Sequence, residues 1–195
     1  WLRLKLIADI GLIGLPNAGK STLLSRVTAA KPKIADYPFT TLHPNLGVVH
    51  QDNKEFVIAD IPGLIEGAHE GSGLGHRFLG HVERCKGLLH LIDVTSDNIK
   101  RDYLTIIREL EAYDTSLSEK KQIIVLTKCD AVNEQKLNLA KEQLKKLNVQ
   151  KVFGISSVSG ENITKLVRQL QDLITSMNKI EDNEDGLEKV SSWSP

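Results

Sequence analysis

The stretch IGLIGLPNAGKSTLL, from Ile10 to Leu24, decides the fold of this chain. It follows the spacing G-x-x-x-x-G-K-S, which is typical of a phosphate-binding loop, with Gly14, Gly19, Lys20 and Ser21 as its defining residues. An apolar run precedes the loop and a helical pattern follows it, so the loop lies between a buried strand and a helix N-terminus. Glycines at both ends allow backbone N–H groups to surround a diphosphate without Cβ clashes.

Two side chains of this loop have predicted chemical roles. We expect Lys20 to bring positive charge to the β- and γ-phosphates, and the hydroxyl of Ser21 to bind Mg²⁺. A turn that merely favours glycine would not need a lysine and a serine at this offset, so the motif predicts nucleotide binding. The expected phosphate-binding residues are Gly14, Leu15, Pro16, Asn17, Ala18, Gly19, Lys20, Ser21 and Thr22.

Length and composition bound the class of protein. The chain has 195 residues, which suits one α/β domain, and its 25 basic and 25 acidic residues balance. Nothing in the bulk charge suggests a polyanion-binding or membrane-surface protein. The cysteines Cys85 and Cys129 indicate reduced thiols rather than a disulfide framework. With no apolar run near the length of a membrane span and no signal-peptide layout, we expect a soluble, cytoplasmic protein without a membrane partner.

Strand and helix patterns alternate along the chain after one hairpin. The pattern predicts a mostly parallel six-stranded sheet with one antiparallel strand, helices on both faces and the ligand at the carboxyl edge of the strands. Expected strands cover 7–13, 46–50, 55–59, 87–94, 122–126 and 151–154, preceded by an entry strand over 2–6. Expected helices cover about 21–30 and 76–85, a segment capped by Ser96 or Asp97, a segment around 137–147, and 163–177.

Three segments are expected to be irregular. Residues 31–45 hold three prolines and predict a long loop beside the phosphate site, and residues 64–75 hold four glycines and predict a loop that is mobile until something binds it. The tail, residues 179–195, carries five acids against two lysines, a net charge of −3, and few apolar residues. We expect it to be a disordered, solvated tail.

The sequence Asp60-Ile61-Pro62-Gly63 follows a buried strand directly. At this position the Asp60 carboxylate is expected to hold Mg²⁺, and the Gly63 amide to reach the γ-phosphate. A plain Asp-Pro-Gly turn is the alternative, but the presence of this motif together with the phosphate loop favours the catalytic interpretation.

A second motif, Thr127-Lys128-x-Asp130, indicates how a base is recognised. A carboxylate at Asp130 accepts both N1–H and N2–H of guanine, while the stem of Lys128 lies along the ring. Adenine cannot satisfy that carboxylate, so the motif predicts GTP rather than ATP. Asn is commoner than Thr at position 127, which puts part of the bracing of the phosphate loop in doubt. Backbone N–H groups of Ser156, Ser157 and Val158 would face the guanine O6, although a helix cap explains this segment equally well.

The two long loops, KPKIADYPFTTLHPNLGVV and DIPGLIEGAHEGSGLGHRFLGHVERC, resemble those of the Obg/CgtA family. The resemblance runs from Leu4 to about Met177 and implies a Ras-like P-loop NTPase fold of the translation-factor class, with an OBG-type G domain over 1–178. It implies that Thr41 binds Mg²⁺ and senses the γ-phosphate, with Phe39 and Thr40 beside the nucleotide. It also implies that the family's glycine-rich N-terminal domain is absent from these residues.

The family resemblance also predicts an activity and its partners. The resemblance implies a monomeric GTPase that binds GTP and GDP, acts with the large ribosomal subunit or its precursors, and responds to the alarmone ppGpp. Leu64 stands where related enzymes keep a water-orienting Gln, and no arginine finger is evident, since Arg77 and Arg84 belong to a helix. We therefore expect slow hydrolysis, with Lys20, Thr41 and Gly63 as its main groups.

Asn17 and the activity of the chain each allow an alternative interpretation. Asn17 resembles an asparagine that binds K⁺ in cation-activated relatives, or is simply a turn residue. The chain could be a guanine-nucleotide sensor whose hydrolysis is incidental. It could also be an ATPase, as in a sister family with a similar YPFTT loop, but that family lacks the motif that carries Asp130.

Overall fold

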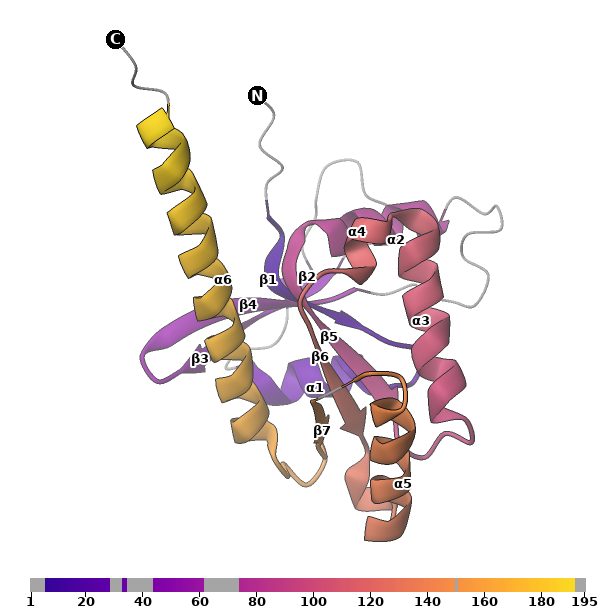
Figure 1. Ribbon diagram of the computed structural model, residues 1–195. Coiled ribbons are helices and arrows are strands. Elements are labelled where there is room, and N and C mark those ends of the chain that lie inside the picture. The colour runs from indigo at the N-terminus through magenta and orange to yellow at the C-terminus, as the bar shows by residue number, and fades with distance from the viewer. Residues whose placement is uncertain (1–5, 29–32, 35–43, 62–73, 150, 192–195) are drawn as a thin grey trace.

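The computed structural model describes residues 6–28, 33–34, 44–61, 74–149 and 151–191 (Figure 1). Within these ranges, seven strands form one sheet in the spatial order β2-β3-β4-β1-β5-β6-β7. The strands are β1 Ala8–Ile13, β2 Lys33–Ile34, β3 Asn45–Gln51, β4 Lys54–Asp60, β5 Cys85–Asp93, β6 Gln122–Thr127 and β7 Val152–Gly154. Because β1 lies between β4 and β5, the loop that follows it opens at the middle of the sheet edge.

The strand directions confirm the predicted sheet. β1, β4, β5, β6 and β7 pair in parallel, and β3 is antiparallel to β4. The two-residue β2 is an addition, because it falls in the segment predicted as loop and pairs with Asn45 and Leu46 on the free edge of β3. The entry strand predicted over 2–6 lies outside the described residues except for Leu6, which is not in a strand.

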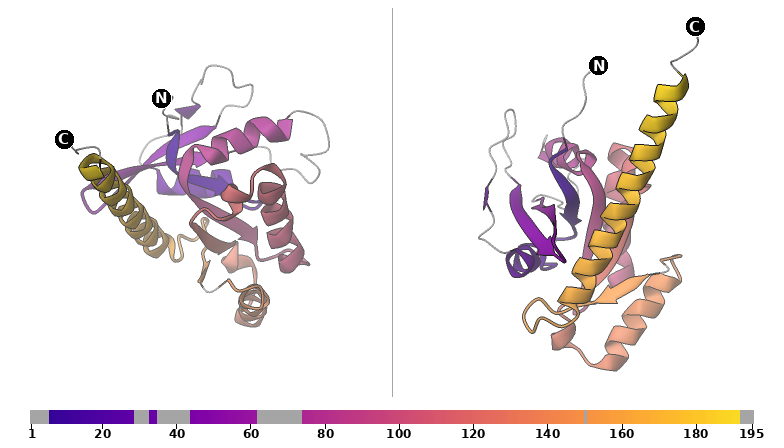
Figure 2. Two further views of the ribbon diagram at one scale, coloured as in Figure 1. Left: turned by 45° about the horizontal axis from the view of Figure 1, so that its top comes forward. Right: turned by 90° about the vertical axis from the view of Figure 1, so that its left-hand side faces the viewer.

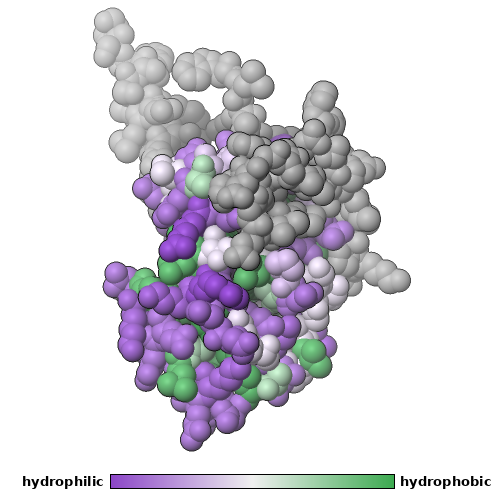
Figure 3. All heavy atoms as spheres, turned by 90° about the vertical axis from the view of Figure 1, so that its right-hand side faces the viewer, coloured by the Kyte–Doolittle hydropathy of each residue, from purple (hydrophilic) through white to green (hydrophobic). Residues whose placement is uncertain are grey.

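Helices cover both faces of the sheet, as predicted (Figure 2). α1 and α6 pack on one face, and α2, α3 and α5 on the other. The helices are α1 Lys20–Val27, α2 Leu74–Glu83, α3 Ile99–Tyr113, α4 Thr115–Ser118, α5 Glu134–Lys145 and α6 Ile163–Ser191, with a short 3-10 helix, η1, over Cys129–Ala131. Figure 3 shows that the face beside α3 and α5 is mostly hydrophilic.

The apolar run of β5 fills both layers of the core. Leu89 and Leu91 belong to the cluster under α1 and α6, whereas Leu88 and Ile92 belong to the clusters under the opposite helices. Alternation of side chains along a strand therefore turns one continuous apolar run into two buried faces. The thiols of Cys85 and Cys129 are free and buried, as expected of small core groups.

Among the helix ends that differ from the sequence prediction, those of α3 and α1 have a clear local cause. α3 is capped by Asn98, whose side chain accepts from the backbone N–H of Arg101 at 2.9 Å, and not by Ser96 or Asp97. The Ser96 hydroxyl is used otherwise, since it donates to Asp102 in the first turn. α1 ends at Val27 rather than near residue 30, and the Thr28 hydroxyl donates to the carbonyl of Leu24 at 2.9 Å.

The C-terminal tail was predicted to be disordered, whereas the structure assigns residues 179–191 to the end of α6. α6 continues to Ser191 and rises past the sheet (Figure 1). Its buried residues up to Met177 pack the first part of the helix against the sheet. Among the described residues, no helix combines the length and the apolar character that a membrane crossing requires.

The predicted hairpin turn between β3 and β4 is confirmed. Asp52 and Asn53 have φ angles of 47° and 61°, the left-handed conformation of a two-residue turn. Arg168 of α6 lies 3.6 Å from the Asp52 carboxylate, so a solvent-exposed ion pair links the hairpin tip to the helix.

Candidate functional site

The phosphate loop joins the end of β1 to the start of α1 in the conformation that its glycines predict. Gly14 has a φ of 146°, and a Cβ built there would lie 2.4 Å from the carbonyl oxygen of Leu91. Gly19 has a φ of 93° and occupies the N-cap of α1. The backbone N–H groups of the first helical turn therefore open toward the loop, where they can receive an anion.

Lys20 lies over the loop that it follows. Its Nζ donates to the carbonyl oxygens of Gly14 at 2.8 Å and Leu15 at 3.1 Å. Burial lowers the pKa of Lys20, and the Asp60 carboxylate partly offsets this. The ammonium group is thus held by the backbone in the concave part of the loop, which is where a diphosphate would lie.

Ser21 and Asp60 meet across the site from α1 and β4. The Ser21 hydroxyl donates to Oδ2 of Asp60 at 2.6 Å. Asp60 is only 3% exposed, and its other oxygen, Oδ1, has no hydrogen-bond partner in the described part of the chain. A hydroxyl beside a buried carboxylate with an unused oxygen is a donor set that suits Mg²⁺, because hard divalent cations prefer oxygen ligands.

Several predicted site residues lie outside the described residues, so the structure does not place them. They are Phe39, Thr40, Thr41, Pro62 and Gly63. Ile61 is described and is buried in the core rather than open to a ligand.

Thr127 braces the phosphate loop, although it replaces the commoner Asn. Its buried hydroxyl lies 2.8 Å from the carbonyl oxygen of Ala18 in the loop and 3.3 Å from that of Ile92 in β5. The side chain also packs under Gly19, 3.8 Å from a Cβ built there. The bracing that the sequence put in doubt is therefore present through a hydroxyl instead of an amide.

Removing this hydroxyl should destabilise the protein. We expect Thr127→Val, which keeps the volume of the side chain, to lower the free energy of unfolding by about 1–3 kcal/mol, because the Ala18 carbonyl would lose a buried donor. Urea unfolding measures the change. The exposed Thr22→Val on α1 serves as the control, with an expected change below about 0.5 kcal/mol. Equal stability of Thr127→Val and the parent would contradict the bracing role.

A pocket of about 190 Å³ opens beside the brace, at the carboxyl ends of β6 and β7. It brings together the start of α1, the Thr127-Lys128-x-Asp130 motif and the loop after β7. Its lining residues are Gly19, Thr22, Thr127, Lys128, Asp130, Ala131, Ser157 and Val158. Asp130 is exposed. Val158 is also 76% exposed, which is unusual for a valine, and an aromatic base in the pocket would cover it.

Backbone hydrogen bonds hold the two halves of this pocket together. The N–H of Cys129 donates to Ile155 at 3.1 Å, and the N–H of Ile155 donates to Leu126 at 2.9 Å. Ser156, predicted to contact a ligand, is fully buried and does not line the pocket. Its hydroxyl accepts from the N–H of Ser159 at 3.0 Å, so it shapes the loop that presents Ser157 and Val158.

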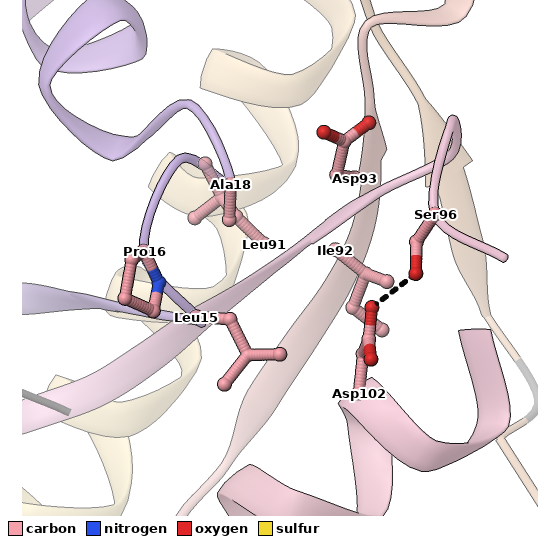
Figure 4. Close-up of a pocket in the computed structure, with 8 residues that line it drawn as sticks. All are labelled: Leu15, Pro16, Ala18, Leu91, Ile92, Asp93, Ser96 and Asp102. Carbon is pink, nitrogen blue, oxygen red and sulfur yellow. Dashed lines mark hydrogen bonds between the residues drawn. The ribbon is translucent and has the colours of Figure 1, made fainter. Parts of the chain in front are cut away.

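A second pocket, also about 190 Å³, lies on the other side of the phosphate loop (Figure 4). Only its phosphate-loop residues were predicted from the sequence to contact a ligand. Leu15, Pro16 and Ala18 of the loop form one wall, and Leu91, Ile92, Asp93, Ser96 and Asp102 form the rest. The position of Asp93 at the carboxyl end of β5 could have predicted this pocket from the sequence, because polar residues at that edge of a parallel sheet lie near the ligand.

His90 is a fully buried base in the middle of β5. Its ring stacks on Tyr103 of α3 with centroids 5.4 Å apart, and neither nitrogen has a hydrogen-bond partner among the residues described. Burial, with a smaller effect of the Lys20 charge, lowers the pKa of His90 from 6.5 to about 3. The imidazole is therefore neutral in the folded protein at any ordinary pH.

This histidine should make stability depend on pH. Between pH 6.5 and 3 the unfolded chain binds a proton at His90 that the folded protein does not, so stability falls as the pH falls through that window. From pH 7 to 5 its contribution to the free energy of unfolding should fall by about 2 kcal/mol. Urea unfolding at the two pH values should show that His90→Phe, which keeps the stacked ring, loses less stability than the parent protein by this amount. An identical loss in both proteins would contradict the assignment.

A family model described as "50S ribosome-binding GTPase" matches residues 9–128. A second model, described as "Ethanolamine utilisation - propanediol utilisation", matches residues 103–172.

Solved structures share the fold. A structure of Era in complex with MgGDPNP and a segment of 16S ribosomal RNA is 25% identical, with a TM-score of 0.63 over 87% of this chain and 57% of that one. An Aquifex aeolicus Era variant bound to GDP and aluminium fluoride is 22% identical, with a TM-score of 0.63 over 86% and 57%. The G domain of the T. maritima FeoB iron transporter is 21% identical, with a TM-score of 0.62 over 84% and 96%. The chain thus spans little more than half of the Era chains and nearly all of the isolated FeoB G domain.

Proposed function

This chain belongs to the family of 50S ribosome-binding GTPases, and from that membership we propose that it is a slow molecular switch that hydrolyses GTP to GDP and phosphate. The observation that supports this most is that one residue connects the two halves of the site. Thr127 begins the base-reading motif, lines its pocket and hydrogen-bonds to Ala18 of the phosphate loop. A nucleotide whose base lies beside Asp130 would therefore have its phosphates at Lys20.

Magnesium fits this proposal. Ser21 and Asp60 would hold Mg²⁺, with Thr41 as the further ligand that the resemblance implies. When bound, Mg²⁺ neutralises charge on the β- and γ-phosphates. The Gly63 amide would contact the γ-phosphate, so that loss of this group on hydrolysis would release the segments that carry Thr41 and Gly63.

Hydrolysis is expected to be slow, because Leu64 cannot orient a water molecule as a Gln does. K⁺ at Asn17 would supply part of the missing positive charge. Asn17 has a φ of 63°, a left-handed turn conformation that asparagine tolerates, so a turn role also accounts for this residue.

The potassium proposal predicts that turnover depends on the monovalent cation. We expect GTP hydrolysis to be several-fold faster in KCl than in NaCl at equal ionic strength. Asn17→Gly, which keeps the turn but removes the amide oxygen, should abolish the difference. Phosphate release measures both rates, and equal rates in the two salts would eliminate K⁺ from the account.

We further propose that the chain belongs to the Obg/CgtA branch and acts in the cytoplasm, as a monomer, on large ribosomal subunits or their precursors. The two loop sequences quoted above support the branch. The Era structure with ribosomal RNA concerns that protein, and it makes a ribosomal partner reasonable here. Single-turnover hydrolysis by this chain should be at least tenfold faster with purified large subunits than with small subunits. No acceleration by either would contradict the switch with a ribosomal partner.

That negative result would favour the alternative, a guanine-nucleotide sensor in which hydrolysis is incidental. A sensor would respond to the occupancy of the pocket by GTP, GDP or ppGpp. Competition of ppGpp against a fluorescent GDP analogue tests it, and affinity for ppGpp comparable to that for GDP would support the sensor.

A further inference from the structure

Asp93 is a carboxylate beside the candidate site that has no role in the proposed function. It is the last residue of β5, directly opposite Thr127 in the parallel register with β6. Its Oδ2 lies 2.5 Å from Nζ of Lys128, the lysine of the base-reading motif. The contact joins two residues that are 35 positions apart in the sequence, at the edge where the phosphate loop and the base pocket meet.

The carboxylate is itself held in place. Its Oδ1 accepts from the backbone N–H of Thr95 at 2.9 Å and from the Thr95 hydroxyl at 2.7 Å. Lys136 of α5 donates in turn to the carbonyl of Thr95 at 3.0 Å. Both oxygens of Asp93 thus have partners, and the turn after β5 fixes the position from which it contacts Lys128.

The ion pair with Asp93 restricts the conformation of Lys128. Its φ of 58° is left-handed, a conformation that lysine rarely adopts. Its side chain is 41% exposed and lines the base pocket, so without a fixed partner the long stem would sample many rotamers. The Asp93 ion pair selects one of them.

Asp93 stays charged under ordinary conditions. Burial alone would raise its pKa, but the hydrogen bonds from Lys128 and Thr95 outweigh burial and hold the pKa below its usual value. The ion pair therefore persists throughout the neutral range.

We propose that Asp93 is a positioning residue for base recognition, which holds Lys128 so that its stem lies flat along the purine ring opposite Val158. The inference rests on the proposed function, since it assumes a guanine nucleotide in this pocket. It assigns affinity to Asp93 and selectivity to Asp130. Packing along the ring face is the same for any purine, whereas Asp130 reads the N1–H and N2–H groups of guanine.

A double-mutant cycle tests this division of labour. The probes are GDP and inosine diphosphate, which lacks the 2-amino group. We expect Asp93→Asn to weaken both by about tenfold and to leave their ratio unchanged. In a Lys128→Met background the same substitution should weaken binding less than twofold, because the contact is already lost. The neighbouring exposed Asp97→Asn, on the same turn, is the matched control and should change neither affinity.

The expected loss of affinity in Asp93→Asn should not arise from a folding defect. Asp93→Asn keeps an oxygen that can accept from Thr95, and the melting temperature without nucleotide should change little, because a half-exposed ion pair adds little stability. Lys128→Met alone leaves Asp93 intact and should reproduce the tenfold loss. Additive effects in the cycle, or a changed ratio of GDP to inosine diphosphate, would overturn the inference. Failure of the parent protein to bind GDP would instead overturn the proposed function.

Discussion

Asp130→Asn is expected to lower GDP affinity at least a hundredfold and to shift preference toward xanthosine diphosphate. Asp130 is exposed at the edge of the base pocket, where its carboxylate can accept two hydrogen bonds from guanine. Asparagine offers one acceptor and one donor, and the donor faces a guanine N–H. Xanthine replaces the 2-amino group with a carbonyl, which matches the amide. Unsatisfied polar groups in such a site reduce affinity by several orders of magnitude.

Competition against a fluorescent guanine nucleotide measures the shift. Because Asp130 is exposed, its substitution should change the free energy of unfolding by no more than about 0.5 kcal/mol, so a folding defect is not expected. The exposed Asp172→Asn on α6, away from the pocket, would control for the loss of one negative charge. Unchanged GDP affinity in Asp130→Asn would contradict the assignment of base recognition.

Lys20→Met should weaken GDP binding by about a hundredfold to a thousandfold while leaving guanosine binding unchanged. The Lys20 ammonium group is held over the loop by the Gly14 and Leu15 carbonyls, and its charge-assisted hydrogen bonds to phosphate are worth roughly 1.5–3 kcal/mol each. Guanosine lacks phosphate and so should not detect the change. Isothermal titration with both ligands gives the comparison.

The exposed Lys165→Met on α6 is the charge-matched control for this variant. It should bind GDP as the parent does. If Lys20→Met lost guanosine and GDP affinity alike, the substitution would have disrupted the pocket as a whole, and the specific role of Lys20 at the phosphates would be wrong.

Much of the fold could be predicted from the sequence, because its signals are local. The spacing of Gly14, Gly19 and Lys20 fixes a strand, a turn and a helix in succession, and the structure has β1, the loop and α1 there. Asp60 and Ser21 were each predicted to bind Mg²⁺, and the structure brings their side chains within 2.6 Å of each other.

What could not be predicted depends on contacts between distant segments. The ion pair of Asp93 with Lys128 has no signature in spacing, since it requires β5 and β6 to be neighbours. Thr127 put the bracing of the phosphate loop in doubt, because only its distance to Ala18 shows that a hydroxyl can replace the amide of asparagine. The backbone N–H of Ser156 was expected to face a ligand, but it donates to the carbonyl of Glu161 at 3.2 Å, a contact that the spacing of residues does not reveal.

We propose that one continuous site holds a polyphosphate near Lys20 and recognises its base at Asp130. Direct competition of GDP and ADP for the site, with Mg²⁺ present and a fluorescent guanine nucleotide as probe, tests it most directly. We predict displacement by GDP at a concentration at least a hundredfold lower than by ADP. Equal displacement by both nucleotides, or no binding of the probe, would contradict the claim.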